Sequence, residues 1–447
     1  MFSAEQKEEN EKKEKRGFVF GSYGRVQPAT DLEGGSAKWT NIVKHGSRLE
    51  QGSYVELDFG YLFKQPANGP KFDFISTLAF SESLFHSNGK WSAINSVRNL
   101  FVRAENVVWK PLNMWVGSRM FRGDDIYLLD FWPLDEANMY GGGIGIKFDN
   151  WSIDYYVGFN RLEIDWQYQE KQVITDTFGS ESITWMERQR LVTGLKYEQR
   201  HQISDKGTGV KWKLLGELQR IGAGKKYNDP VDDSNLISYP EDFGWSVGGQ
   251  LGFYGYLKNS FVNMFIKYSG GLAAYGLMTV PWGFNTEYKT TGAKEILFGI
   301  SSNSEFKYFG NMFGAYVRYF EDSDSNKYDN DDFVEYIFSI RPHFVLHKYF
   351  YLAFELSHQL RKTNGLTRLS DDSHKNILPQ VTKLSLMPLV TIGGGNYERP
   401  QIRLVYTAAF QNNDARALYH KDDIRAKRNV LHYFGLSAEW WFNLEHR

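Results

Sequence analysis

A period-two alternation of polar and apolar residues limits most strongly how this 447-residue chain can fold. The alternation recurs from Gly17 to the C-terminus, with turn residues between segments, and helical periodicity is scarce. In residues 54–61, one face carries Tyr54, Glu56 and Asp58, and the residues between them are apolar or aromatic. Because a membrane barrel turns polar residues inward and apolar residues outward, this segment predicts a barrel strand.

Further strands are predicted along the whole chain by the same pattern. They are residues 143–148, 151–159, 212–221, 245–257, 261–268, 311–320, 334–346, 349–360, 401–410 and 433–442. No run of roughly 18 apolar residues is present, so membrane-spanning helices are not expected. The aromatic share of 16% and the excess of Gly (42) over Pro (12) suit strands with glycine turns and aromatic interfaces.

Three segments are expected from the distribution of charge and pattern. Residues 1–16 carry mixed charges and few apolar residues, which predicts a flexible N-terminal arm. Residues 17–442 are expected to form one transmembrane β-barrel, and residues 443–447 a short C-terminal extension. No signal peptide is visible, so the chain is expected to be a mature or trimmed form.

Several function classes are disfavoured by the composition. A net charge of −1 with dispersed basic residues gives no field for nucleic acid. The absence of cysteine removes thiol catalysis and cysteine metal sites. No G-x-S-x-G motif is present and the acidic clusters lack EF-hand spacing, so neither an enzyme nor a metal or cofactor site is expected. A soluble β-sandwich or propeller remains open, because alternation alone cannot distinguish lipid from a packed core.

Five patches resemble the maltoporins, the sugar porins of bacterial outer membranes. The most specific is residues 106–135, with WVGSRMFRGDDIYLLDFW at 115–132, which is similar to the maltoporin region around the pore constriction. Residues 22–25, 48–56, 398–403 and 434–442 agree in order and spacing. The resemblance implies an 18-stranded antiparallel transmembrane β-barrel with an inward-folded constriction loop, assembled as a homotrimer among the lipids of a Gram-negative outer membrane.

The resemblance also implies a route for oligosaccharides, because a sugar ring stacks on aromatic planes and its hydroxyls bond to charged groups. The positions that match the family's aromatic slide are Tyr23, Tyr54, Tyr397 and Trp441, with Trp91 as a weaker candidate. The positions that match its polar track and constriction are Arg25, Arg48, Glu56, Arg103, Arg122, Asp125, Asp130 and Trp132. Ordinary packing aromatics and solvated lumen charges are the alternative interpretation.

Two departures from the family pattern lie at the constriction. Trp132 stands where the family often has tyrosine, and Tyr127 where it can have histidine, so a preference for long maltodextrins is in doubt. From the resemblance as a whole, we expect facilitated, passive diffusion of maltodextrin-like sugars. A general or anion-preferring porin without sugar recognition and a soluble carbohydrate-binding β protein are the alternatives.

Overall fold

The computed structural model describes residues 16–66, 69–81, 89, 94–176, 179–205, 207–227, 236–326, 331–369 and 371–444. Residues 1–15 of the expected arm, residues 445–447 of the expected extension, and Trp91 lie outside the described residues. Arg16, the last residue of that arm, forms an ion pair with Asp73 at 2.7 Å. Within the described ranges, no helix is long and apolar enough to cross a membrane.

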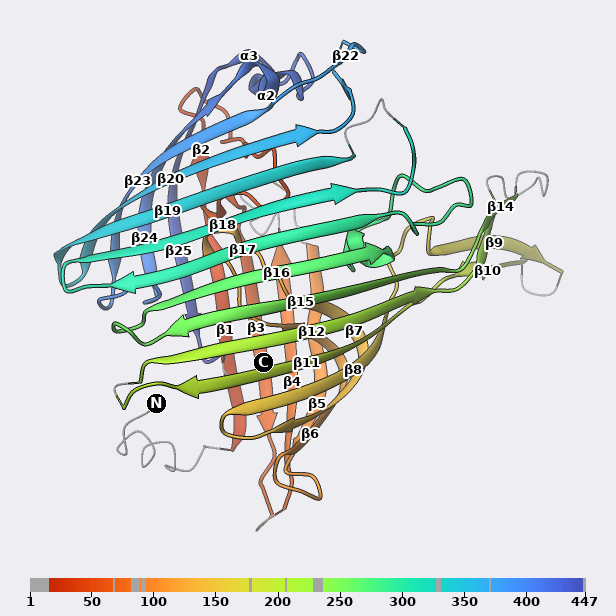
Figure 1. Ribbon diagram of the computed structural model, residues 1–447, viewed down its shortest axis with the longest axis horizontal. Helices are drawn as coiled ribbons and strands as arrows, with labels where there is room; N and C mark the ends of the chain where they lie inside the picture. Colours follow the sequence, from red (N-terminus) through yellow and green to blue (C-terminus); the bar gives the residue numbers. More distant parts are fainter. Residues whose placement is uncertain are drawn as a thin grey trace.

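Eighteen antiparallel strands form one closed β-barrel, as predicted, because β1 pairs with β3 on one side and with the last strand, β25, on the other. Figure 1 shows these strands running side by side around the barrel. The barrel strands are β1 (Gly17–Val26), β3 (Tyr54–Leu62), β4 (Lys71–Ser81), β5 (Ile94–Glu105), β6 (Leu112–Arg122), β7 (Glu136–Lys147), β8 (Trp151–Asn160), β11 (Arg190–Gln202), β12 (Gly209–Ile221), β15 (Asp242–Tyr254), β16 (Phe261–Gly271), β17 (Lys294–Glu305), β18 (Phe309–Glu321), β19 (Phe333–His347), β20 (Phe350–Thr363), β23 (Gln380–Thr391), β24 (Gln401–Gln411) and β25 (Val430–Phe442).

The remaining elements belong to the longer connections at one end of the barrel, which we call the loop end. Figure 1 shows β9, β10 and β14 extending away from the barrel, and the two short helices lying together at its rim. These elements are β2 (Ala29–Thr30), β9 (Tyr168–Thr175), β10 (Gly179–Glu187), β13 (Gly224–Tyr227), β14 (Leu236–Tyr239), β21 (Thr367–Arg368), β22 (His374–Lys375), α2 (Asn413–Ala417), α3 (Ile424–Lys427) and the 3-10 turns η1 (Arg48–Glu50), η3 (Tyr127–Leu129) and η4 (Leu272–Tyr275). Short turns connect the strands at the opposite end, the turn end.

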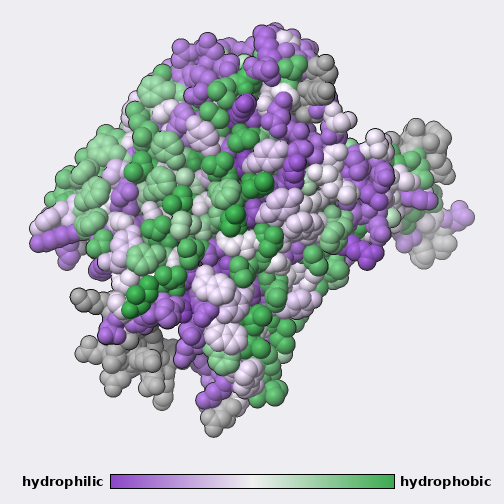
Figure 2. All heavy atoms as spheres, in the orientation of Figure 1, coloured by the Kyte–Doolittle hydropathy of each residue, from purple (hydrophilic) through white to green (hydrophobic). Residues whose placement is uncertain are grey.

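The two faces of each strand meet different surroundings. In β15, the side chains of Trp245 and Val247 are 42% and 51% exposed on the outside, whereas inward Ser246 and Gln250 are buried. Figure 2 shows hydrophobic residues gathered over the strands and hydrophilic residues toward the rim with α2. An apolar outer face on a polar interior is the arrangement that lipid requires.

Most predicted strand segments lie inside observed strands, and the alternation assigned to residues 54–61 is confirmed, since Glu56 and Asp58 are buried inside. The segment predicted as 245–257 ends earlier, at Tyr254. Gly255 follows with a φ of 73°, a left-handed conformation that glycine adopts without strain, and it begins the turn.

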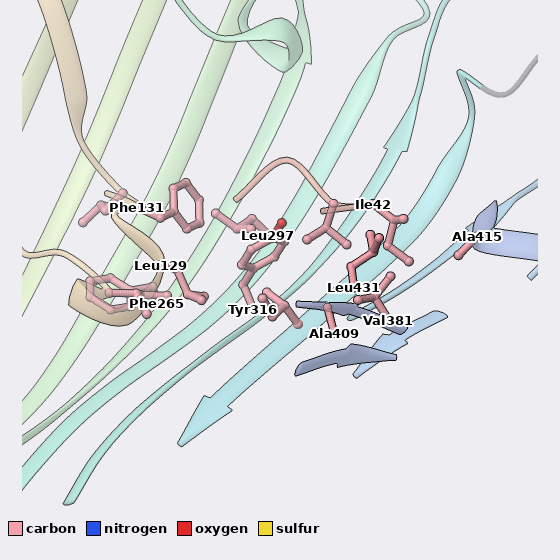
Figure 3. Packing of buried hydrophobic residues seen from close by; sticks show 14 of the residues in the cluster. Ile42, Leu129, Phe131, Phe265, Leu297, Tyr316, Val381, Ala409, Ala415 and Leu431 are labelled. Atoms are coloured by element: carbon pink, nitrogen blue, oxygen red, sulfur yellow. The ribbon is translucent and has the colours of Figure 1, made fainter. Parts of the chain in front are cut away.

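The predicted inward-folded loop is residues 123–135, which we call the constriction loop. It anchors its apolar residues against the far wall of the barrel. A Cβ at Gly314 of β18 would lie 2.5 Å from Cγ2 of Ile126, and one at Gly248 of β15 would lie 2.5 Å from Cδ1 of Leu134. The wall therefore has glycines where the loop approaches most closely. Figure 3 shows Phe131 of the loop beside the wall residues of this apolar cluster.

A second segment folds inward, residues 27–53, which we call the first loop. Figure 3 shows its Ile42 among Val381, Ala409 and Leu431 of the wall. Its Glu50 accepts a 2.7 Å bond from Lys383 of β23. The ring of His45 stacks on Phe131, with centroids 3.9 Å apart. The two inward segments thus support each other in the lumen.

Candidate functional site

Most of the predicted site residues surround one lumen cavity of about 600 Å³, which we call the inner cavity. β1, β3, β25 and the constriction loop contribute most of its wall. The predicted residues that line it are Tyr23, Tyr54, Tyr397, Trp441, Arg25, Arg48, Glu56, Arg122, Asp125, Asp130 and Trp132. Its other lining residues are Arg98, Tyr127, Glu136 and Leu444. The structure therefore brings together predicted positions up to 418 residues apart in sequence, as Tyr23 and Trp441 show.

The aromatic side chains form two pairs, and a further tyrosine contacts the second pair. The ring centroids of Tyr23 and Tyr54 are 6.0 Å apart, and those of Tyr397 and Trp441 are 6.5 Å apart. Tyr127 lies edge-on to both members of the second pair, at 5.3 and 6.2 Å. The cavity thus offers several ring faces in succession, which is the surface on which a sugar ring stacks.

A buried carboxylate holds the arginines of the cavity in place. Glu439 of β25 is 2% exposed and pairs with Arg48 at 2.9 Å, with Arg399 at 2.9 Å and with Arg403. The hydroxyl of Tyr127 donates to the same carboxylate at 2.9 Å. Such charge-assisted bonds fix geometry strongly when they are shielded from bulk water. Tyr127 is buried among these groups. Its hydroxyl therefore stabilises the barrel wall.

Asp130 joins the constriction loop to the barrel wall. Its two carboxylate oxygens accept bonds from Arg48 at 3.2 Å and Arg25 at 3.4 Å. Burial alone would raise the pKa of Asp130, but the positive charges of Arg48 and Arg25 outweigh it and hold that pKa below its usual value. Asp130 is therefore charged at neutral pH. Nearby, burial raises the pKa of Asp125 to about 6.

Arg98 was missed by the sequence analysis because it sits at a β-bulge. The pairing of β4 with β5 shifts between Thr77 and Leu78, so Arg98 has no partner opposite it. Strict alternation places it with outward Leu100, but the bulge turns it inward. There its guanidinium donates to Oε1 of Glu56 at 2.5 Å and also to the hydroxyl of Tyr54.

The constriction is formed by Trp132 with two flanking charges. The guanidinium carbon of Arg122 lies 4.0 Å from the ring centroid of Trp132, a cation–π distance. Arg122 also pairs with Glu136 at 2.7 Å. Both Trp132 and Glu136 line a further small cavity of about 80 Å³ on the loop side, which we call the waist.

Arg103 is the predicted site residue that the structure places elsewhere. It forms ion pairs with Asp73 at 3.0 Å and Glu105 at 3.5 Å and does not line the inner cavity. Arg16 shares the Asp73 carboxylate, so these charges form a separate group. Among the described residues, no cluster of histidine and carboxylate side chains could hold a metal ion.

Cavities follow one another through the lumen, because neighbouring cavities share lining residues. A turn-end cavity of about 550 Å³ shares Asp125 and Tyr397 with the inner cavity. The waist follows at Trp132, and it shares Lys44 and Arg318 with an outer vestibule of about 510 Å³. The series runs from the turns to the long loops, as a transmembrane route requires.

Comparisons with known proteins identify the family of this chain. A family model described as LamB porin matches residues 18–442. No curated protein matches the chain. Similar solved structures include OccK1 (OpdK) of Pseudomonas aeruginosa, with 8% identity, a TM-score of 0.45 and coverage of 95% of this chain and 97% of that chain. The outer membrane channel DcaP of Acinetobacter baumannii has 10% identity, a TM-score of 0.46 and coverages of 95% and 98%. OprB of Pseudomonas putida has 8% identity, a TM-score of 0.43 and coverages of 95% and 94%.

Proposed function

The chain belongs to the LamB porin family, and from the lining of its inner cavity we propose that it conducts sugars by facilitated, passive diffusion. It is a porin channel in the outer membrane of a Gram-negative bacterium. Long loops face outward and short turns face the periplasm in such barrels. A sugar would therefore enter at the vestibule, pass the waist and leave through the inner cavity.

The observation that carries the proposal is the convergence of ring faces and charges in the inner cavity. Four arginines and four carboxylates line it beside the aromatic rings. Sugar rings stack on the aromatic faces, and paired charges of both signs can donate to and accept from hydroxyls. The balanced charge suits a neutral oligosaccharide such as a maltodextrin.

Weak binding at successive positions suits transport better than one tight site, because a solute that binds too well leaves slowly. The series of cavities is consistent with such stepwise passage. No energy source or cofactor enters this proposal. We also expect three copies to associate, which would appear as a heat-resistant trimer on a gel after detergent extraction.

The proposal is tested in a planar bilayer by titrating maltooligosaccharides and sucrose while conductance is recorded. Saturable block is expected, with a half-blocking concentration that ranks the sugars. Steady conductance at every sugar concentration would contradict sugar recognition, and the protein would then be a porin that does not bind these sugars.

Replacing the ring faces locates the binding site. Trp441→Ala and Tyr54→Ala should each raise the half-blocking concentration by about five- to tenfold, since one stacking contact contributes about 1–1.5 kcal/mol. Trp245→Ala is the matched control, because Trp245 faces outward and should leave block unchanged. Unchanged block in both lumen variants would refute their assignment.

A general or anion-preferring porin is the second candidate, and the constriction residues favour it. Tyr127 is used in the wall, and Arg122 covers one face of Trp132, so neither presents a free ring at the narrow section. This candidate predicts ion selectivity without sugar block in the same bilayer experiment.

A further inference from the structure

The outer vestibule differs chemically from the inner cavity. Its described lining includes three cationic side chains, Lys44, Arg318 and Arg361, and no carboxylate. The inner cavity instead balances four arginines with four carboxylates. A solute that enters from the loop end therefore first meets a positively charged surface.

The counter-charges of the two arginines are not part of the vestibule lining. Glu335 is fully buried, and its carboxylate is 3.6 Å from Arg318 and 3.7 Å from Arg361. Glu295 approaches Arg318 to 2.5 Å. Neither carboxylate lines the vestibule, although Glu295 lines the waist.

Lys44 gives the vestibule its surplus charge. It is an exposed residue of the first loop, and its amino group has no ion-pair partner in the described part of the chain. The backbone N–H of Lys44 donates to Glu335 at 3.3 Å, so the residue is anchored while its side chain stays open to the lumen. Lys44 lines both the vestibule and the waist, which places its charge at the passage between them.

The vestibule also has surfaces that suit a sugar ring. Trp282, Phe333 and Tyr419 line it together with the hydroxyls of Thr279 and Thr363. The indole N–H of Trp282 is buried and has no hydrogen-bond partner in the described residues. Aromatic side chains and hydroxyls beside cations match a saccharide that carries an acidic group.

We propose that the outer vestibule is an entry site for anionic saccharides, of which a uronate is the simplest, and that Lys44 determines this preference. The inference rests on the proposed sugar channel and specifies one substrate class for it. The carboxylate of the sugar lies against Lys44 while its ring lies against the aromatic side of the vestibule. The solute then passes Lys44 into the waist.

The test compares two sugars of the same length, maltotriose and maltotriose oxidised to a glucuronate at its non-reducing end. Block of single-channel conductance is measured with each sugar added to each side, at neutral pH and low salt. The uronate should block at about fivefold lower concentration than maltotriose, the factor expected for one charge pair near 4 Å in water. In Lys44→Met the half-blocking concentrations of the two sugars should become equal, and in Lys44→Glu that of the uronate should become the higher one.

Lys348→Met is the matched control, because Lys348 lies on a short turn at the other end of the barrel and should keep the uronate advantage. Block by maltotriose with no uronate advantage in the unaltered protein, or an advantage that survives Lys44→Met, would overturn the vestibule proposal alone. Lys44-dependent block by the uronate without block by maltotriose would uphold it and reject neutral sugars. Absence of block by either sugar would overturn both proposals.

Discussion

Glu439 shows how single residues set the chemistry of the lumen. Its carboxylate pairs with Arg48, Arg399 and Arg403, and it also accepts from Tyr127. Removing one partner from such a group leaves an uncompensated buried charge, which is costly. Arg48 and Tyr127 are therefore positioned by the wall. The groups open to a passing sugar are the more exposed ones, such as Glu136 at the constriction.

Asp125 should make the selectivity of the pore depend on pH. Burial raises its pKa to about 6, so the carboxyl is neutral at pH 5 and charged at pH 7.5. As pH rises through about 6, one negative charge appears in the inner cavity, and preference for cations should increase. The reversal potential in a salt gradient measures this shift.

Asp125→Asn is the control for that titration, since it should keep the low-pH selectivity at all pH values. His45 should not contribute, because burial holds the pKa of its imidazole well below the usual value and it stays neutral across this range. An equal pH shift in Asp125→Asn would assign the titration to another group.

At the scale of elements, the constriction depends on how a loop fits a strand face. Ile126 and Leu134 of the constriction loop contact the wall where β18 and β15 carry Gly314 and Gly248. Interiors are close-packed, so a side chain at either glycine cannot be accommodated without moving the loop. The stacking of His45 on Phe131 carries such a displacement to the first loop.

Gly314→Leu should displace the constriction loop and widen the pore. The new Cβ would stand 2.5 Å from Cγ2 of Ile126, a distance that real contacts do not show. We expect higher single-channel conductance and weaker sugar block, measured in the bilayer. Gly216→Leu is the control, because nothing lies within 4 Å of a Cβ at that position of β12. Equal conductance in both variants would show that the loop does not limit the pore.

Alternation predicted the inward faces of regular strands, as Glu56 shows, but it fails where a strand is irregular. The bulge in β5 reverses the face of Arg98, and no glycine or proline marks it in the sequence. The inward fold of the first loop was also not predicted. Its anchors are on distant strands, such as Lys383 for Glu50, and local pattern carries no information about them. Arg103 matched the family in spacing, but it pairs with Asp73 on the neighbouring strand.

At the scale of the whole molecule, the closure of the β-sheet decides between the two interpretations of the alternating pattern, a membrane barrel and a soluble sandwich. Because β1 pairs with β25, every strand has two neighbours and the barrel has no open edge. The pattern alone left a soluble sandwich open, and the strand number came from the family resemblance. The closed sheet settles the choice, since its outer surface carries exposed apolar side chains from Leu214 on β12 to Ile402 on β24.

This division between a lipid-facing exterior and a polar lumen predicts that the energetic cost of a charged side chain on the outer surface depends on its depth in the membrane. Val247 lies mid-strand on the outside of β15, and Ile203 lies beyond the end of β11 at the turn end. An arginine at the membrane midplane costs about 2–4 kcal/mol and near the interface about 0–1 kcal/mol. Val247→Arg should therefore lower the free energy of unfolding from lipid vesicles by the larger amount, and Ile203→Arg should lower it by the smaller amount. Urea titrations of the vesicle-inserted protein measure both values. Because both substitutions replace a β-branched side chain with the same cation, equal losses would mean that Val247 does not face the hydrocarbon core.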